Sequence, residues 1–382
     1  MAVANLETAK RKRDSDALPH DAKRPRHTVA QRLAAKGILR KDELIESWLN
    51  NSFWSRRILA QSRDLTQRAV DKMPPRTLLP SPSGSRSSFG SVSSSRKSEK
   101  RLASVHDADF RDSLRHRNVY INVRRPSTEL LRRAKSIIMR PRTSPEIDDA
   151  TAQELRDVSR KLETEGEEVI VQEMMPYLLP STQRASRQGL ARNANQVWAN
   201  AVPVPLDSDV LADPLPLPRP KPDLTFGYSQ AAFNHKQLTT IDLLLDQAGR
   251  SYALPDKKLR FPFLAVELKS QAKMGTHFTA MNQAANAGSI ATNGVLELMR
   301  RSSDEEHLNS DEPQFFSLSM DHAYACVNVH WLCTNAEEGR FSFHVEGLSK
   351  HFLDDEDGIR AVRRAVRNIM DYGAEERLKT LC

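Results

Sequence analysis

The feature that most constrains the fold is an apolar run that ends in two opposite charges, Phe261–Ser270. Successive side chains of a β-strand point to opposite faces, so a strand here would divide the run into two sets. One set is apolar and the other ends in charge: Leu264, Val266 and Leu268 against Ala265, Glu267 and Lys269. A nearly continuous apolar strand is usually buried on both faces, where charges are costly unless they pair or bind an ion. The run therefore predicts a central strand that carries a site.

A second acidic residue opens another short run with strand propensity. Residues 219–228 read Arg-Pro-Lys-Pro-Asp-Leu-Thr-Phe-Gly-Tyr, so Asp223 follows a proline and precedes β-prone residues. Beyond the first run, residues 276–301 predict a helix that contains Gln283. Asp223, Glu267 and Lys269 together resemble the signature of the PD-(D/E)XK nuclease superfamily.

A larger part of the chain, residues 109–372, resembles an uncharacterised fungal family of PD-(D/E)XK nuclease-like domains within the restriction-endonuclease-like superfamily. The motifs that carry the resemblance are Lys221-Pro222-Asp223 with Phe226-Gly227-Tyr228, Phe261-Pro262-Phe263-Leu264 with Glu267-Leu268-Lys269-Ser270, Asn282-Gln283-Ala284-Ala285, Val329-His330-Trp331 and Asn368-Ile369-Met370-Asp371-Tyr372-Gly373. The resemblance implies an α/β fold with a PD-(D/E)XK core, in which helices flank both faces of a mixed central sheet. It also implies descent from metal-dependent nucleases.

Phosphodiester hydrolysis requires an activated water and a cation that neutralises charge on the phosphate. The resemblance assigns the metal to the carboxylates of Asp223 and Glu267 and the carbonyl of Leu268. The expected ion is Mg²⁺ or Mn²⁺, which prefer oxygen ligands. Lys269 is expected to position the water and stabilise developing charge, and Gln283 to orient Lys269 or a phosphate. The alternative is an ion pair between Glu267 and Lys269 in a domain that has lost catalysis.

Other residues compete for these roles. Asp256 also follows a proline and lies nearer to Glu267 in sequence, but its basic neighbours favour a turn. A preceding helix supplies a further carboxylate in some superfamily members, and the acidic residues in the right place are Glu163, Glu167 and Glu168. We interpret these three as a solvated helix end. His330 lies in an alternating run and is interpreted as a sheet-face histidine rather than a ligand.

The hydrophobic pattern predicts further elements around the two acidic strands. Helices are expected at 129–140, from Ser144 to about Glu163, and at 357–372, and Pro176 argues against a helix extending to Leu179. Strands are expected at 314–320, 323–334 and 340–346. Residues 180–222 are rich in proline and predict an extended loop, and residues 230–260 predict an insertion before the charged strand.

Charge divides the chain into two parts. Residues 1–150 hold 32 Lys and Arg against 17 Asp and Glu, whereas the remaining residues hold 25 against 32. Within the basic part we expect a tail at 1–30, a helical segment at 28–72 and a disordered Ser/Pro/Arg-rich linker at 73–105. The nuclease-like domain is assigned to 106–376. A basic arm attracts nucleic acid without reading its sequence.

The tail also carries two basic clusters, 10–13 and 23–26, whose spacing is typical of a bipartite nuclear import signal. We therefore expect a nuclear protein that binds an import receptor through residues 10–26. No apolar run is long enough for a membrane helix, and three cysteines form no disulfide or zinc framework. The expected function is hydrolysis of phosphodiester bonds in nucleic acid, and DNA is expected as the partner ahead of RNA. The alternative is an inactive nuclease fold that acts as a nuclear nucleic-acid-binding or interaction module.

Overall fold

The structure is a computed structural model that describes residues 102–382, except 144–146, 182–184, 187–188, 212, 303–308 and 336–339. The predicted basic tail, helical segment and nearly all of the linker lie outside the described residues. Within the described part, no helix combines the length and apolar character that a bilayer crossing requires.

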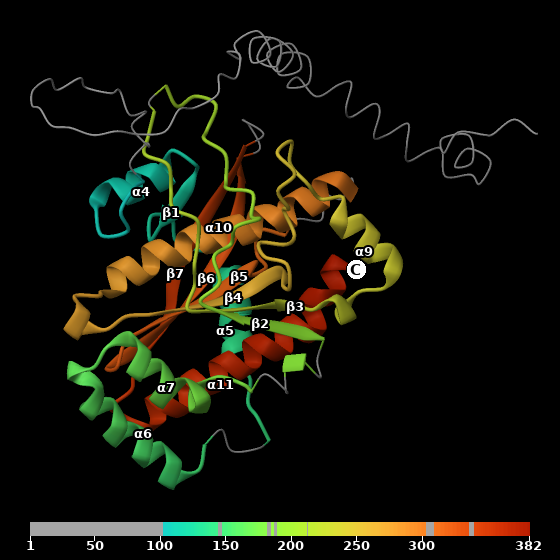
Figure 1. Ribbon diagram of the computed structural model, residues 1–382. Coiled ribbons are helices and arrows are strands. Elements are labelled where there is room, and N and C mark those ends of the chain that lie inside the picture. Colours follow the sequence, from blue (N-terminus) through green and yellow to red (C-terminus); the bar gives the residue numbers. More distant parts are fainter. Residues whose placement is uncertain are drawn as a thin grey trace, which may run out of the picture. The chain divides into compact units, whose positions relative to one another are not determined.

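A seven-stranded mixed sheet forms the centre of the domain (Figure 1), in the order β1-β7-β6-β5-β4-β3-β2. The strands are β1 (Val119–Ile121), β2 (Leu190–Ala194), β3 (Leu224–Tyr228), β4 (Arg260–Leu268), β5 (Phe315–Met320), β6 (Tyr324–Asn335) and β7 (Arg340–Phe352). Neighbouring strands are antiparallel except for two parallel pairs, β1 with β7 and β4 with β5. The predicted α/β class and the mixed central sheet are confirmed.

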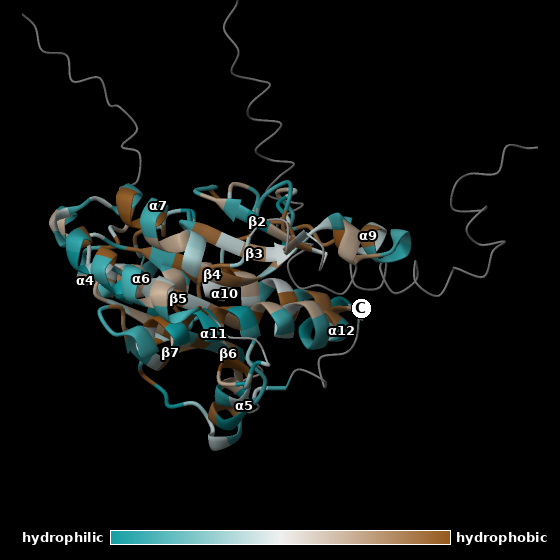
Figure 2. Cartoon of the chain, turned by 90° about the horizontal axis from the view of Figure 1, so that it is seen from below, coloured by the Kyte–Doolittle hydropathy of each residue, from teal (hydrophilic) through white to brown (hydrophobic). Residues whose placement is uncertain are grey.

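Helices cover both faces of the sheet. They are α4 (Ala108–Arg115), α5 (Thr128–Ile138), α6 (Asp149–Lys161), α7 (Glu167–Leu178), α9 (His235–Asp242), α10 (His277–Ser302), α11 (Glu356–Tyr372) and α12 (Leu378–Leu381). On one face, α4 and α10 share an apolar cluster with β1 and Ala265 of β4. On the other, α5, α6, α7 and α11 enclose the larger cluster. Figure 2 shows hydrophobic residues along the central strands and mainly hydrophilic ones on α4 and α6.

Strand β4 lies in the middle of the sheet and is buried along its whole length. Leu264, Val266 and Leu268 pack into the larger cluster beneath α11, whereas Ala265 packs into the smaller cluster beneath α10. This division confirms the two faces predicted from the alternation of side chains. Glu267 therefore points to the face that α10 covers.

Helix α10 approaches that face closely because it is built from small residues. Its inner surface consists largely of buried Ala, Ser, Thr and Gly, and a methyl group placed on Gly288 would lie 2.3 Å from Nδ1 of His330. Real carbon–nitrogen contacts are never that short, so only glycine allows the helix and β6 to approach as they do.

Four predicted boundaries were wrong. Strand β2 lies inside the segment predicted as loop, because its pairing with β3 needs backbone groups rather than apolar side chains. Helix α7 continues through Pro176, since burial of Met174, Met175 and Leu178 outweighs the lost backbone hydrogen bond. Helix α6 begins at Asp149 with Asp148 as its cap. Strand β7 extends to Phe352, six residues beyond the prediction.

Candidate active site

Two carboxylates face each other across neighbouring strands. In the antiparallel pair β3–β4, Leu224 lies opposite Val266 and Thr225 opposite Ala265. Carrying this register one residue further places Asp223 opposite Glu267, on the sheet face beneath α10. Directly opposed residues have Cβ atoms about 5 Å apart, close enough for both carboxylates to contact one ion. The structure therefore brings together two acids that are separated by 43 residues in the chain.

Asp223 is held in place by the backbone of the charged strand. One of its oxygens, Oδ2, accepts a hydrogen bond from the Leu268 N–H at 2.7 Å. Burial raises the pKa of Asp223, and the charge of Glu167 adds to this, whereas Lys269, the Leu268 N–H and Lys221 act in the opposite direction. Burial prevails, so this carboxyl ionises less readily than an exposed aspartate.

Glu267 is the most deeply buried charge of the site. Its side chain is 1% exposed, and its Oε2 has no protein hydrogen-bond partner among the described residues. Burial raises the pKa of Glu267 well above its usual range, and the nearby charges of Asp223 and Glu167 raise it further, against the effect of Lys269. A buried carboxylate with an unused oxygen is stable in its charged form only if a cation comes to it. The donor set thus fits a hard divalent metal.

Lys269 does not form the ion pair with Glu267 that the alternative, a domain without catalysis, predicts; its partners lie elsewhere. Its ammonium donates a hydrogen bond to the Leu268 carbonyl at 2.7 Å and lies 3.9 Å from Oε1 of Glu167. Glu167 is the first residue of α7, and its side chain is 40% exposed. The interpretation of Glu167 as solvent-facing is therefore wrong in part, since it contributes negative charge to the site. Glu163 and Glu168 are exposed, as interpreted.

Three carboxylates thus influence one another, but they do not form a three-ligand cage. Among the described residues, no three His, Cys, Asp or Glu side chains are arranged to hold a metal ion. The available donors are the two opposed carboxylates and the Leu268 carbonyl. A carbonyl oxygen has two lone pairs, so the hydrogen bond from Lys269 leaves one for another partner.

Comparison with known proteins places this region within one family. Residues 154–382, more than half of the chain, match the family described as a domain of unknown function (DUF7924). The chain belongs to this family. No curated protein matches its sequence. The matched part of the DUF7924 domain includes the site residues Glu167, Asp223, Glu267, Lys269 and Gln283.

Gln283 lies in the second turn of α10, on the helix that covers the carboxylate face of the DUF7924 domain. Its Oε1 is buried and has no hydrogen-bond partner among the described residues. Its neighbour Asn282 is paired through both amide atoms, since it donates to the Val105 carbonyl and accepts from Arg111. The segment that leads from β4 into α10 passes close to Lys269. A methyl group on Gly275 in this segment would lie 3.0 Å from Cβ of Lys269.

Asp256, the rival to Asp223, belongs to a turn as expected. Its Oδ1 accepts the backbone N–H groups of Lys258 and Leu259, and its other oxygen accepts from the Asn193 side chain. These contacts use both oxygens of Asp256 to close the turn that leads into β4. Asp256 is therefore left with a local structural role.

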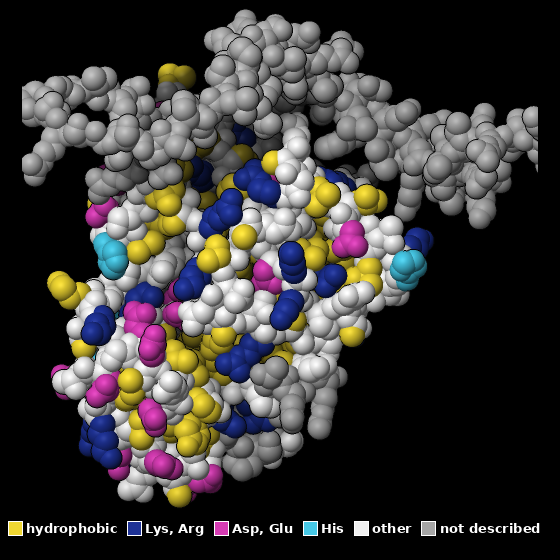
Figure 3. Space-filling model, in the orientation of Figure 1, with side chains coloured by type: hydrophobic (Ala, Val, Ile, Leu, Met, Phe, Trp, Pro, Cys, Tyr) yellow, Lys and Arg dark blue, Asp and Glu magenta, His cyan; other side chains and the backbone are white. Residues whose placement is uncertain are grey.

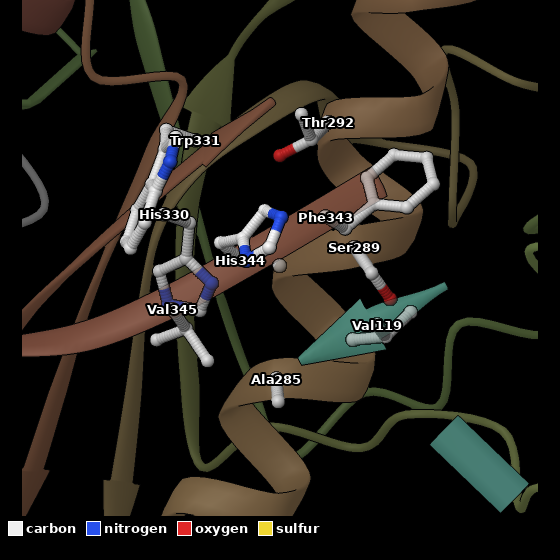
Figure 4. A pocket seen from close by; sticks show the side chains of 10 residues that line it. Val119, Ala285, Ser289, Thr292, His330, Trp331, Phe343, His344 and Val345 are labelled. Carbon is white, nitrogen blue, oxygen red and sulfur yellow. The ribbon is translucent and has the colours of Figure 1, made fainter. Parts of the chain in front are cut away.

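His330 lies against α10 with Val345, Ser289 and Thr292 around it, as Figure 4 shows. Its Nε2 is 2.9 Å from the Ser317 hydroxyl, and burial lowers its pKa to about 3. The crevice that it lines is too narrow for a water molecule. His330 is thus a neutral, buried histidine of the sheet face, as interpreted from its alternating run.

Asp321 and His277 flank the charged strand and were not singled out from the sequence. Asp321 directly follows β5 and is 2% exposed. The last residue of β5 accepts a hydrogen bond from the Lys269 N–H through its carbonyl. Oδ2 of Asp321 lies 3.3 Å from Nε2 of His277 and accepts from Gln271. Burial acts to raise the pKa of Asp321, but the hydrogen bonds it accepts lower it to about 2. No short sequence motif links these residues, so only the fold shows their proximity.

Proposed function

We propose that this domain is a metal-dependent nuclease of the PD-(D/E)XK type. The observation that carries the proposal is the opposition of Asp223, which directly precedes β3, and Glu267 of β4, with Glu267 buried and one of its oxygens unpaired. The order of elements supports it: α7, the antiparallel strands β2, β3 and β4, α10, and then β5 parallel to β4. A mixed sheet with helices on both faces, and with a carboxylate-bearing strand inside it, supports this proposal.

The residues present would hold Mg²⁺ or Mn²⁺ through the carboxylates of Asp223 and Glu267 and the carbonyl of Leu268. The ion would neutralise charge on the phosphate and lower the cost of forming the nucleophile. Ionisation of Glu267 would be coupled to arrival of the ion, because burial raises the pKa of Glu267 and favours the protonated acid. Glu167, whose side chain is 40% exposed, would add attraction for cations.

Lys269 would act on the water and on the phosphate. Lys269 is 8% exposed. Its ammonium is held by the Leu268 carbonyl and by the charge of Glu167. A cation held in this way can orient an attacking water and stabilise negative charge as it develops on a phosphate oxygen. The unpaired amide oxygen of Gln283 would complete the polar surroundings of that water.

One observation favours a second function, a nucleic-acid-binding module without catalysis. Among the described residues no three acidic, His or Cys side chains can share a metal, so the site depends on two carboxylates and a carbonyl. In this second function the basic N-terminal part of the chain would supply most of the affinity. Cleavage separates the two functions.

The test is hydrolysis of single- and double-stranded DNA and RNA with Mg²⁺ or Mn²⁺, against EDTA. We expect metal-dependent cleavage by the wild type and a loss of about a hundredfold or more in Lys269→Ala, because a positioned charge is removed from the transition state. Asp223→Asn should lose activity similarly. Asp256→Asn is the matched control and should retain activity, since Asp256 closes a turn.

Thermal unfolding of each variant shows whether the fold is intact. If the wild type and Lys269→Ala were equally inactive on every substrate while both bound nucleic acid, the binding module would replace the nuclease. If Asp256→Asn abolished cleavage and Asp223→Asn did not, the choice of the first acid would be wrong.

A further inference from the structure

The sheet register connects the candidate active site to the far edge of the sheet. Glu267 pairs with Ser319 on β5, Ser319 with Cys326 on β6, and Cys326 with Lys350 on β7. Paired residues point to the same face, so all four side chains lie on the face of Glu267. Strands are about 4.8 Å apart, which places the backbone of Lys350 roughly 14 Å from that of Glu267.

The next row along the same face contains aromatic rings. Asp321, one residue after the β5 strand, is bonded through its N–H to the Tyr324 carbonyl, and Tyr324 pairs with Phe352. The imidazole of His277, from the first turn of α10, stacks on Tyr324 with centroids 3.8 Å apart and planes 11° apart. Its Nε2 also lies 3.3 Å from Asp321. The row begins next to Lys269, whose N–H bonds to the last residue of β5.

Lys350 contacts the rings of both Tyr324 and Phe352. Its Nζ lies 3.7 Å from the centroid of Tyr324 and 5.9 Å from that of Phe352. We name the four residues His277, Tyr324, Lys350 and Phe352 the stacking ladder. Its inner ring, Tyr324, is covered by the imidazole and the ammonium, whereas its outer ring, Phe352, is 58% exposed.

Packing of the fold does not account for this ladder. Among the described strands, β1 pairs with residues 343–345 of β7, so the segment 346–352 pairs with β6 alone and forms a sheet edge. A lysine on an edge strand discourages pairing with other chains, which would explain Lys350. It would not explain a phenylalanine that is more than half exposed at the end of the same strand.

We propose that the stacking ladder binds single-stranded nucleic acid beside the candidate active site, with a base on Phe352 and a phosphate at Lys350. This inference rests on the proposed nuclease function. Unpaired bases stack on exposed aromatic rings, whereas the bases of a duplex are already stacked and paired. Asp354, two residues after Phe352, is exposed and would repel phosphates. The sugar-phosphate backbone of the bound strand would therefore pass on the side of Lys350.

The test is binding to fluorescent oligonucleotides in EDTA, which prevents cleavage, with the full-length chain at moderate salt. The probes are oligo(dT), oligo(U), a duplex and an abasic oligomer of the same length as oligo(dT). The wild type should bind oligo(dT) more tightly than the abasic oligomer. Phe352→Ala should weaken oligo(dT) binding roughly fivefold or more and remove the preference for bases. Phe352→Trp should retain the preference for bases. Oligo(U) shows whether RNA shares the site.

Lys350→Ala should weaken oligo(dT) and the abasic oligomer equally, because it removes a phosphate contact and leaves the outer ring. The matched controls are Tyr177→Ala on α7 and Lys236→Ala on α9, an exposed ring and an exposed ammonium away from the ladder, and both should bind as the wild type. Wild-type affinity and base preference in Phe352→Ala would overturn the ladder, even if metal-dependent cleavage were found. Lys269→Ala should lose cleavage and keep the oligo(dT) affinity of the wild type, because Lys269 does not belong to the stacking ladder. Failure of the nuclease proposal can therefore be told apart from failure of the ladder.

Discussion

Glu267 combines a cost to folding with a use in function. The fold buries its carboxyl almost completely and leaves Oε2 unpaired, and burial raises its pKa well above the usual range. The stabilising contribution of an acid whose pKa is raised by folding is complete below the pKa of the unfolded state, about 4.3 for glutamate. The contribution is lost as pH rises through the pKa of the folded state. Without a metal, the domain should therefore become less stable as pH rises above about 4.3.

Glu267→Gln should remove this loss, because glutamine is neutral and similar in shape. We expect the metal-free variant to melt at a higher temperature than the metal-free wild type at neutral pH. The gain should be about 1.4 kcal/mol for each pH unit over which Glu267 resists ionisation. Mg²⁺ or Mn²⁺ should raise the melting temperature of the wild type and not that of the variant. Thermal unfolding from pH 4 to 8 with EDTA or metal measures both effects, and equal metal stabilisation of the two proteins would contradict a role of Glu267 as ligand.

The residues of the site differ in how far sequence could predict them. Asp223, Glu267 and Lys269 stand in a recognisable pattern, and alternation along the strand predicted that Glu267 shares a face with Ala265. That α10 covers this face is seen only in the structure. The contact of Lys269 with Glu167 depends on where α7 begins relative to β4, which no spacing encodes. Asp321 enters through the register of β4 with β5, a long-range pairing invisible in a local pattern.

Helix α10 sets how closely the carboxylate face is covered. A run of small side chains lets it lie against β4, β5 and β6, and the sequence predicted its span within one residue at each end. Strand β7 was underestimated, because Gly347, Ser349 and Lys350 interrupt the apolar alternation of an edge that is open to solvent. The stacking ladder was missed for the same reason, since its outer half lies on that extension.

Gly288→Ala tests the close packing of α10. The added methyl group would lie 2.3 Å from His330 Nδ1, so the helix or the histidine must move, at a cost of about 1–3 kcal/mol. Gly347→Ala is the control, since a methyl group there would meet its nearest neighbour at 3.8 Å. Urea unfolding compares the two variants. Equal stability of Gly288→Ala and the wild type would show that the helix can shift without cost.

Charge is distributed unevenly over the whole chain. Figure 3 shows acidic side chains gathered over α6 and α7 and basic ones over the upper part of the same face. The net charge of residues 1–150 is nevertheless strongly positive, and that of the remainder is negative. The domain that carries the candidate site therefore has little general attraction for phosphates, and the basic N-terminal part is expected to supply it.

The two basic clusters of residues 10–13 and 23–26 are expected to direct nuclear import. Changing both clusters to alanine in a tagged full-length protein should shift it from the nucleus to the cytoplasm, because an import receptor reads the paired positive charges. Changing one cluster alone should give an intermediate distribution. Fluorescence microscopy measures the ratio of nuclear to cytoplasmic signal. Fusing an unrelated import signal to the doubly changed protein distinguishes import from retention: restored accumulation supports import, whereas failure to accumulate would show that these clusters act by holding the protein on nucleic acid.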